Sequence, residues 1–141
     1  MRATFPVTVH LLFLRENQVL LLRRFNTGYG DGQYSVPAGH LDGDETVMAA
    51  AAREAEEETG VRIEAGHISF SSVMHRREGD ERVDFFVHVL QWQGEPFNTE
   101  PEKCDELRWI NVHELPENII PYVKRAIQNH RDGIKFDEFG W

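Results

Sequence analysis

The chain has 141 residues, of which 40% are hydrophobic and 28% are charged, so it is long enough to bury a core and has the composition of a soluble globular protein. Its formal net charge of -9 argues against a nucleic-acid polymer as the main partner, because phosphate backbones are bound by basic surfaces. We expect one domain over residues 1–141, and an acidic protein of this kind needs a cation to handle a phosphate ligand.

The cysteine content and the N-terminus indicate the compartment. The single cysteine, Cys104, cannot form an internal disulfide, which fits a reducing environment. The first apolar run covers only residues 7–14, which is too short to cross a bilayer, and no small-residue cleavage site of a secretory signal follows it. These features predict a cytoplasmic protein without membrane contact.

In chain order, residues 7–14 and 18–24 are apolar runs that predict two adjacent strands. Residues 25–34, FNTGYGDGQY, contain three glycines and therefore predict a loop. This loop lacks the Gly-Lys-Ser/Thr ending of a P-loop. It is either an ordinary connection between strands or a flap that carries Tyr29 over a ligand.

The next predicted element is the strongest helix, residues 46–59, with Asp44 or Thr46 as its N-cap and Gly60 as its stop. Three further strands and a last amphipathic helix with Pro121 in its first turn complete the chain: strands 68–75 and 83–92 around the charged turn RREGDER, strand 107–111, and helix 119–130. This order predicts a mixed α/β sheet covered by helices.

Three glutamates on helix 46–59 share one face, because Glu54, Glu57 and Glu58 have the spacing i, i+3, i+4. Like charges at this spacing cost a few tenths of a kcal/mol per pair, so their gathering indicates a cation unless they form only a solvated acidic face. Mg²⁺ prefers such oxygen ligands and shares them with substrate phosphates. A different, narrow stripe of mostly small residues suits close packing on a sheet: Met48, Ala51, Ala52, Ala55 and Thr59.

The segment 39–61, GHLDGDETVMAAAAREAEEETGV, has the order Gly39, five residues, Glu45, seven residues and REAEEETGV. It resembles the Nudix box at every fixed position, with Ala55 standing where a larger aliphatic residue is common. The flanking strand order is similar to the same fold. The resemblance implies an α/β/α sandwich with a loop-helix-loop metal site, and hydrolysis of a nucleoside diphosphate linked to another moiety.

The resemblance also implies roles for individual residues. The metal ligands would be Glu54, Glu57, Glu58 and the Gly39 carbonyl, with Mg²⁺ as the cofactor and Mn²⁺ as an alternative ion. Glu54, Glu57 and Arg53 are the catalytic candidates, and Glu54 is also a candidate general base. Arg53 can reach Glu57 or Glu56 along the helix and hold a ligand in position, while Glu45 supports the loop.

Members of the family often recruit one more acidic ligand from the loop before the last strand, and here Glu100 and Glu102 are the candidates. The sequence EPEKC resembles a segment of Nudix enzymes that act on nucleoside triphosphates, which favours Glu102. The alternative is that this loop is only solvated polar surface.

Substrate contacts are expected at Arg23, Arg24, Tyr29 and His40. Because neighbouring strand residues point to opposite faces, only one of Arg23 and Arg24 should face the site. Tyr29 or Phe85 could stack on a base, although an aromatic residue in a strand is more often part of the core. His40 is the histidine closest to the motif.

The substrate is predicted mainly by what is missing. The chain lacks the proline about fifteen residues past the box that marks ADP-ribose pyrophosphatases, the tyrosine of dinucleoside polyphosphate hydrolases and the SQPWPFPxS motif of NADH-cleaving relatives. It therefore looks most like a MutT-type enzyme that converts a small-molecule nucleoside triphosphate, normal or modified, to monophosphate and pyrophosphate. An ADP-ribose or nucleotide-sugar hydrolase and a non-catalytic nucleotide sensor are the alternatives, and a homodimer is compatible with the sequence.

Overall fold

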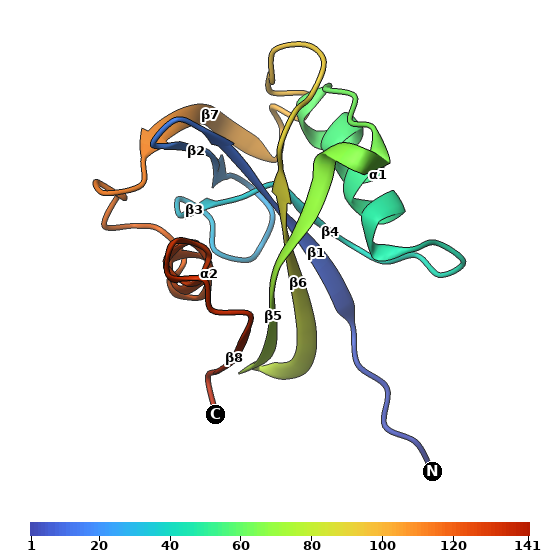
Figure 1. Ribbon diagram of the computed structural model, residues 1–141. Helices are drawn as coiled ribbons and strands as arrows, with labels where there is room; N and C mark the ends of the chain where they lie inside the picture. Colours follow the sequence, from blue (N-terminus) through green and yellow to red (C-terminus); the bar gives the residue numbers. More distant parts are fainter.

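The computed structural model describes residues 1–141 and is organised around a mixed eight-stranded sheet with one long helix against each face (Figure 1). The strands are β1 (Val7–Arg15), β2 (Gln18–Arg24), β3 (Tyr34–Ser35), β4 (Ala38–His40), β5 (Ile68–Glu78), β6 (Asp80–Val89), β7 (Cys104–Asn111) and β8 (Phe136–Phe139). The helices are α1 (Val47–Thr59), a short 3₁₀ turn η1 (Ala65–His67) and α2 (Pro121–Asp132). No helix has the length and apolar character needed to cross a bilayer.

Strand β1 is the hub of the sheet. The main path runs β3-β2-β1-β6-β5-β8, with β4 paired to β1 and β7 paired to β2. Near its start, β1 lies between antiparallel β4 and parallel β6, so that Thr8 is opposite both His40 and Asp84. Its far end pairs antiparallel with β2. Residues at the beginning of β1 are therefore neighbours of the segment that leads into α1.

Side chains of the sheet alternate between two cores, as expected for strands buried on both faces. One core joins the sheet to α1 and includes Val9, Leu11, Phe13, Ala50, Ala51 and Ala55, all fully buried. The other core joins the sheet to α2 and includes Leu12, Leu21, Phe86, Val123, Ala126 and Ile127. The predicted arrangement of helix, sheet and helix is confirmed.

Helix α1 has the caps that its sequence requires. Thr46, and not Asp44, is the N-cap, and its side chain accepts a hydrogen bond from the Ala49 N–H at 3.1 Å. Gly60 ends the helix in the left-handed conformation with a φ of 76°, and its N–H bonds the Glu56 carbonyl. Small residues on the inner face, Ala51 and Ala55, let the helix lie close to β1.

The main departures from the predicted elements concern pairing. The segment RREGDER is not an open turn, because β5 and β6 continue through it to a tight turn at Gly79, where φ is 84°. Strand β6 ends at Val89, earlier than predicted, and β7 begins at Cys104, also earlier than predicted. Helix α2 is shifted by two residues at each end, so that it begins at Pro121 and ends at Asp132. The short strands β3, β4 and β8 were not predicted; β4 and β8 pair with strands about thirty or more residues earlier in the chain, and β3 pairs with the preceding strand β2.

Candidate active site

The Arg53 guanidinium is the centre of the acidic cluster on α1. It binds Glu45 through two hydrogen bonds, from Nε at 3.1 Å and Nη2 at 2.7 Å, and donates from Nη1 to Glu54 at 2.8 Å and to Glu57 at 3.4 Å. Nη2 also donates to the His40 carbonyl at 3.2 Å. The hydrogen bonds with Glu45 raise the pKa of Arg53 and lower that of Glu45, so both groups are held in their charged forms.

The Glu54 carboxylate lies against the backbone of β4. A Cβ on Gly39 would be 2.0 Å from both Cδ and Oε1 of Glu54, so any other residue here would force the Glu54 carboxylate to move away from the β4 backbone. Glu54 is only 8% exposed. Burial raises its pKa, and the neighbouring Arg53 opposes this effect.

Glu58 is the third carboxylate of this face, one helical turn from Glu54. Its Oε2 accepts a hydrogen bond from the Ala38 N–H at 3.1 Å. Burial raises the pKa of Glu58 to about 8, and the negative charges of Glu54 and Glu100 contribute to the rise. A nearby cation would favour the ionised form of such a carboxyl group.

The chemistry of these residues suits a hard divalent cation. Several carboxylates and the β4 backbone, which Glu54 approaches closely, would supply only oxygen ligands. In this structure no three His, Cys, Asp or Glu side chains lie close enough together to form a metal-binding cluster. Instead, Arg53 balances the charge of Glu54 and Glu57, as the spacing of Arg53 and Glu57 predicted. Glu56, the other carboxylate in reach by spacing, is exposed and points elsewhere.

A cavity of about 800 Å³ lies next to this cluster, a size usual for small-molecule sites. Its lining comes from β1, β2, β4, α1, β7 and the start of α2, together with the β2–β3 loop, the β5–β6 hairpin and the loop before β7. Five of the predicted site residues line it: Arg24, Tyr29, Gly39, His40 and Glu58. Glu54, Glu57 and Arg53 are not part of the lining, and they lie on the α1 side of Gly39 and His40.

Only one of the two arginines at the end of β2 faces the cavity, as the alternation of side chains along a strand predicted. Arg24 lines the cavity, and its Nε donates to the Tyr29 carbonyl at 2.6 Å, which ties the β2–β3 loop to the strand. Arg23 instead donates to Asp105 at 2.8 Å, outside the cavity. Tyr29 is 51% exposed at the cavity, whereas Phe85 packs against the core on the α1 side.

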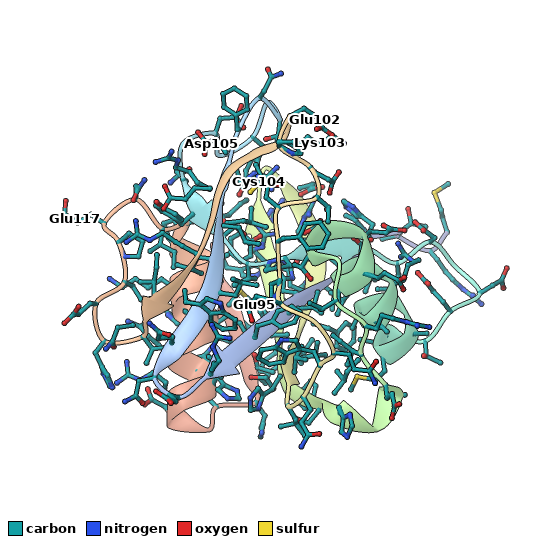
Figure 2. The ribbon with its side chains drawn as sticks, turned by 90° about the horizontal axis from the view of Figure 1, so that it is seen from above. Glu95, Glu102, Lys103, Cys104, Asp105 and Glu117 are labelled. Carbon is teal, nitrogen blue, oxygen red and sulfur yellow. The ribbon has the colours of Figure 1, made fainter.

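The two candidate acids of the loop before β7 also differ in position. Glu100 lines the cavity, and its negative charge raises the pKa of Glu58. Glu102 is exposed and lies beside Lys103 at the outer end of the loop (Figure 2). Neighbouring Asn98 and Lys103 are also part of the lining.

The far wall of the cavity contains a buried polar network that the sequence did not reveal. Arg76 Nε donates to Asp84 at 2.5 Å, the Thr8 hydroxyl donates to the other Asp84 oxygen, and the Arg76 guanidinium lies 3.6 Å from the centre of the Tyr122 ring. Nε2 of His10 and the Tyr122 hydroxyl are 3.0 Å apart. The one available signal was a charged residue, Asp84, within an apolar strand, and its partners became neighbours only through the sheet order.

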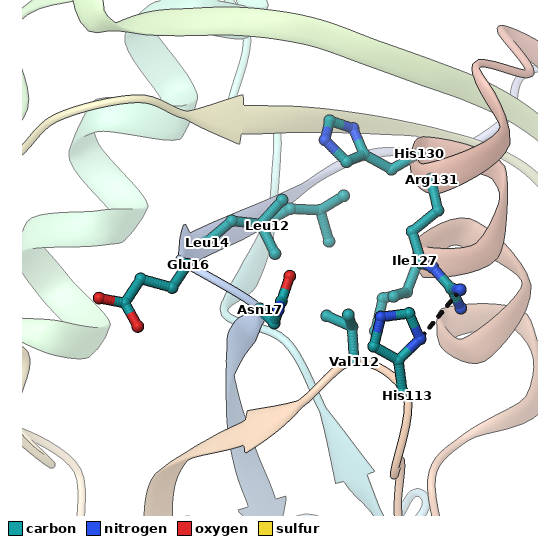
Figure 3. Close-up of a pocket in the computed structure, with 9 residues that line it drawn as sticks. All are labelled: Leu12, Leu14, Glu16, Asn17, Val112, His113, Ile127, His130 and Arg131. Carbon is teal, nitrogen blue, oxygen red and sulfur yellow. Dashed lines mark hydrogen bonds between the residues drawn. The ribbon is translucent and has the colours of Figure 1, made fainter.

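A second cavity, of about 170 Å³, lies between the end of β1, the segment after β7 and α2 (Figure 3). It contains none of the predicted site residues and is lined by Leu12, Leu14, Glu16, Asn17, Val112, His113, Ile127, His130 and Arg131. Arg131 donates to Nδ1 of His113 across its edge at 3.1 Å. The larger of these two cavities is therefore the candidate active site, since it adjoins the carboxylates of α1 and the smaller one does not.

Known proteins share both the sequence pattern and the fold. The sequence profile of the NUDIX domain matches residues 4–130. Phosphatase NudJ of Escherichia coli strain K12 is 28% identical over 146 aligned positions, which cover 96% of this chain and 92% of NudJ. NudJ of Shigella flexneri has the same identity and coverage.

Solved structures agree with this relationship. The MutT NUDIX hydrolase from Burkholderia pseudomallei superposes with a TM-score of 0.82 at 25% identity, covering 90% of this chain and 98% of that protein. The MutT protein from Methanosarcina mazei Go1 has a TM-score of 0.78 at 18% identity, with coverages of 94% and 96%, and shows the shared fold. With the box from Gly39 to Val61 placed on a loop, helix and loop beside a cavity, this chain belongs to the Nudix family and is a hydrolase.

Proposed function

We propose that this enzyme uses Mg²⁺ to hydrolyse a phosphoanhydride bond of a nucleoside triphosphate, normal or modified, releasing a monophosphate and pyrophosphate. Nudix hydrolases act on small-molecule nucleotides and generally use a divalent metal ion, typically Mg²⁺. The observation that carries the proposal is one cavity of about 800 Å³ whose lining combines acidic residues, Glu58 and Glu100, with Arg24 and Tyr29. The first pair suits a cation, and the second suits a phosphate and a planar base.

In this proposal Glu54, Glu57, Glu58 and the Gly39 carbonyl would hold the divalent ion. Glu100 is the further acidic ligand, because it lines the cavity near Glu58 while Glu102 does not. When bound, the ion supplies charge stabilisation at the phosphoryl oxygens and lowers the pKa of the attacking water. The Arg53 contacts with Glu54 and Glu57 hold these carboxylates in place until the ion binds.

The remaining groups orient the nucleotide. Arg24 and Lys103 line the cavity and would neutralise phosphate charge. His40 also lines it, on β4 next to Gly39, and would contact the scissile phosphate. Tyr29 stacks on the base from the β2–β3 loop. Glu54, whose buried carboxyl group has a raised pKa, accepts the proton of the water as it attacks phosphorus, and the bridging oxygen departs with the leaving phosphate group.

A second candidate activity follows from the relatives. The curated protein NudJ is described as a phosphatase, which suggests removal of a terminal phosphate as orthophosphate instead of cleavage to pyrophosphate. A further structure of the same fold is described as an ADP compounds hydrolase, with a TM-score of 0.73 at 20% identity. These alternatives differ in their products, so one assay separates them.

The test is an incubation of purified enzyme with nucleoside triphosphates, nucleoside diphosphates, ADP-ribose and nucleotide sugars, with Mg²⁺ or EDTA, followed by chromatography and assays for orthophosphate and pyrophosphate. Glu57→Gln is compared with Glu56→Gln, because Glu56 lies on the same helix but is exposed and away from the cluster. We expect Mg²⁺-dependent release of pyrophosphate, at least about 100-fold slower in Glu57→Gln and unchanged in Glu56→Gln.

Other outcomes would change the conclusion. Orthophosphate as the sole inorganic product would establish the phosphatase activity. AMP and ribose phosphate from ADP-ribose, formed faster than any triphosphate product, would establish the ADP-ribose activity. Equal losses in Glu57→Gln and Glu56→Gln would refute the metal-site assignment.

A further inference from the structure

The loop before β7 is fastened to the last turn of α1. The Phe97 N–H donates to the Thr59 carbonyl at 3.0 Å, and the Thr99 hydroxyl donates to the Glu57 carbonyl at 2.5 Å. The Phe97 ring also covers Gly60, where a Cβ would be 2.2 Å from Cε1 of that ring. The loop is thus attached to the same helical turn that carries Glu57 and Glu58.

Within this loop, Asn98 connects the two ends of the segment that contains Glu100. Its Nδ2 donates to the Cys104 carbonyl at 2.6 Å, and its Oδ1 accepts from the Glu100 N–H at 3.0 Å. The Glu100 carbonyl in turn accepts from the N–H groups of Lys103 and Cys104, both at 2.9 Å. The Asn98 side chain therefore closes a small ring of backbone from 98 to 104 and fixes Glu100 at its start.

We propose that Asn98 is a positioning residue that holds Glu100 toward Glu58, so that a loop residue completes the cation site formed by α1. The inference rests on the proposed function, because Glu100 has a ligand to complete only if that site binds a metal ion. Asn98 and Glu100 both line the cavity with Glu58. Partners that orient metal ligands through hydrogen bonds commonly change metal affinity about 10- to 100-fold when removed.

An alternative account gives Asn98 a role only in loop stability. Both accounts predict a lower melting temperature for Asn98→Ala, so stability cannot separate them. They differ in whether the effect on metal binding passes through Glu100. A double-mutant cycle measures this coupling directly, since effects that pass through one group are not additive.

The experiment measures Mn²⁺ binding to the full chain, without substrate, from the electron paramagnetic resonance signal of free Mn²⁺. The proteins are wild type, Asn98→Ala, Glu100→Gln, the double variant, and Asn17→Ala as a matched control that lines only the smaller cavity. We expect Asn98→Ala and Glu100→Gln each to weaken Mn²⁺ binding about tenfold, the double variant to be no weaker than Glu100→Gln, and Asn17→Ala to match wild type. Circular dichroism at the assay temperature checks that each variant is folded.

Several results would overturn the inference, and they are distinguishable from failure of the proposed function. If wild type and Glu100→Gln differ in Mn²⁺ affinity but Asn98→Ala equals wild type, Asn98 does not position Glu100, while the metal site stands. If the losses in the double variant add, Asn98 acts by another route. If wild type binds no Mn²⁺ at all, the metal site of the proposed function fails together with the inference.

Discussion

Replacing Gly39 with alanine adds a single methyl group at the point where β4 meets the Glu54 carboxylate. The new Cβ would be 2.0 Å from Cδ and Oε1 of Glu54 and 2.5 Å from Oε2, whereas ordinary contacts begin at 3.4 Å. The carboxylate must therefore move by about 1.4 Å. The backbone of Gly39 is not in the left-handed region, so alanine introduces no conformational strain of its own.

The displacement of Glu54 sets the expected loss of activity. A misplacement of about 1 Å in a catalytic constellation costs on the order of 100-fold in rate, which corresponds to about 2.7 kcal/mol in the activation free energy. We expect kcat of Gly39→Ala to fall by about this factor and Mn²⁺ affinity to fall with it, measured by steady-state kinetics and by electron paramagnetic resonance.

The matched control is Gly66→Ala in η1, where an added Cβ meets nothing within 4 Å and the backbone also avoids positive φ. It makes the same chemical change away from the site, so kcat and Mn²⁺ affinity should equal those of wild type. A kcat of Gly39→Ala within about threefold of wild type would refute the reasoning, because the Glu54 position seen here would then not matter for catalysis.

Three further predictions concern the cavity walls. Arg76→Met leaves Asp84 buried without its ion-pair partner, so the free energy of unfolding from urea titration should fall by about 3–5 kcal/mol. Burial lowers the pKa of His10 to about 4, so below about pH 6.5 the unfolded chain binds a proton that the folded protein rejects. Stability from this source is complete above about pH 6.5 and is lost as the pH falls toward 4, and His10→Asn should lose less stability than wild type between pH 7 and pH 4.5. Tyr29→Ala would remove the proposed base-stacking contact, worth about 1–3 kcal/mol, so KM for the proposed triphosphate substrate should rise about fivefold or more with little change in kcat.

Each of these has a comparison within the chain. Arg15 also pairs with a carboxylate and lies over an aromatic ring, but it is exposed, so Arg15→Met should cost about 1 kcal/mol or less. Equal costs for Arg15→Met and Arg76→Met would contradict the role of burial, and parallel pH profiles for His10→Asn and wild type would contradict the titration of His10. Phe25 lies on the same loop as Tyr29 but does not line the cavity, so an equal rise in KM for Phe25→Ala would show a loop effect and not stacking.

The features that the sequence predicted well are those determined by near neighbours in the chain. Helix α1 runs over Val47–Thr59 because alanine-rich residues, the Thr46 cap and the Gly60 stop are all local signals. The spacing of Glu54, Glu57 and Glu58 places them on a common face for the same reason, since helical geometry fixes which residues are neighbours. The alternation of β2 likewise predicted that only one of Arg23 and Arg24 would face the cavity, although not which one.

Other features depend on which strands pair, and this the sequence could not supply. Arg76 and Asp84 pair across β5 and β6, and Thr8 reaches Asp84 only because β1 lies parallel beside β6. The choice between Glu100 and Glu102 as a cavity residue was decided by bonds from Thr99 and Phe97 to the end of α1, about forty residues away in the chain. The sequence by itself therefore indicated the family through the resemblance of residues 39–61 to the Nudix box, and it determined the helix and its row of carboxylates through local geometry. Only the tertiary structure decided which distant loops and strands meet those carboxylates and so shape the cavity, because long-range pairing depends on the packing of the whole sheet.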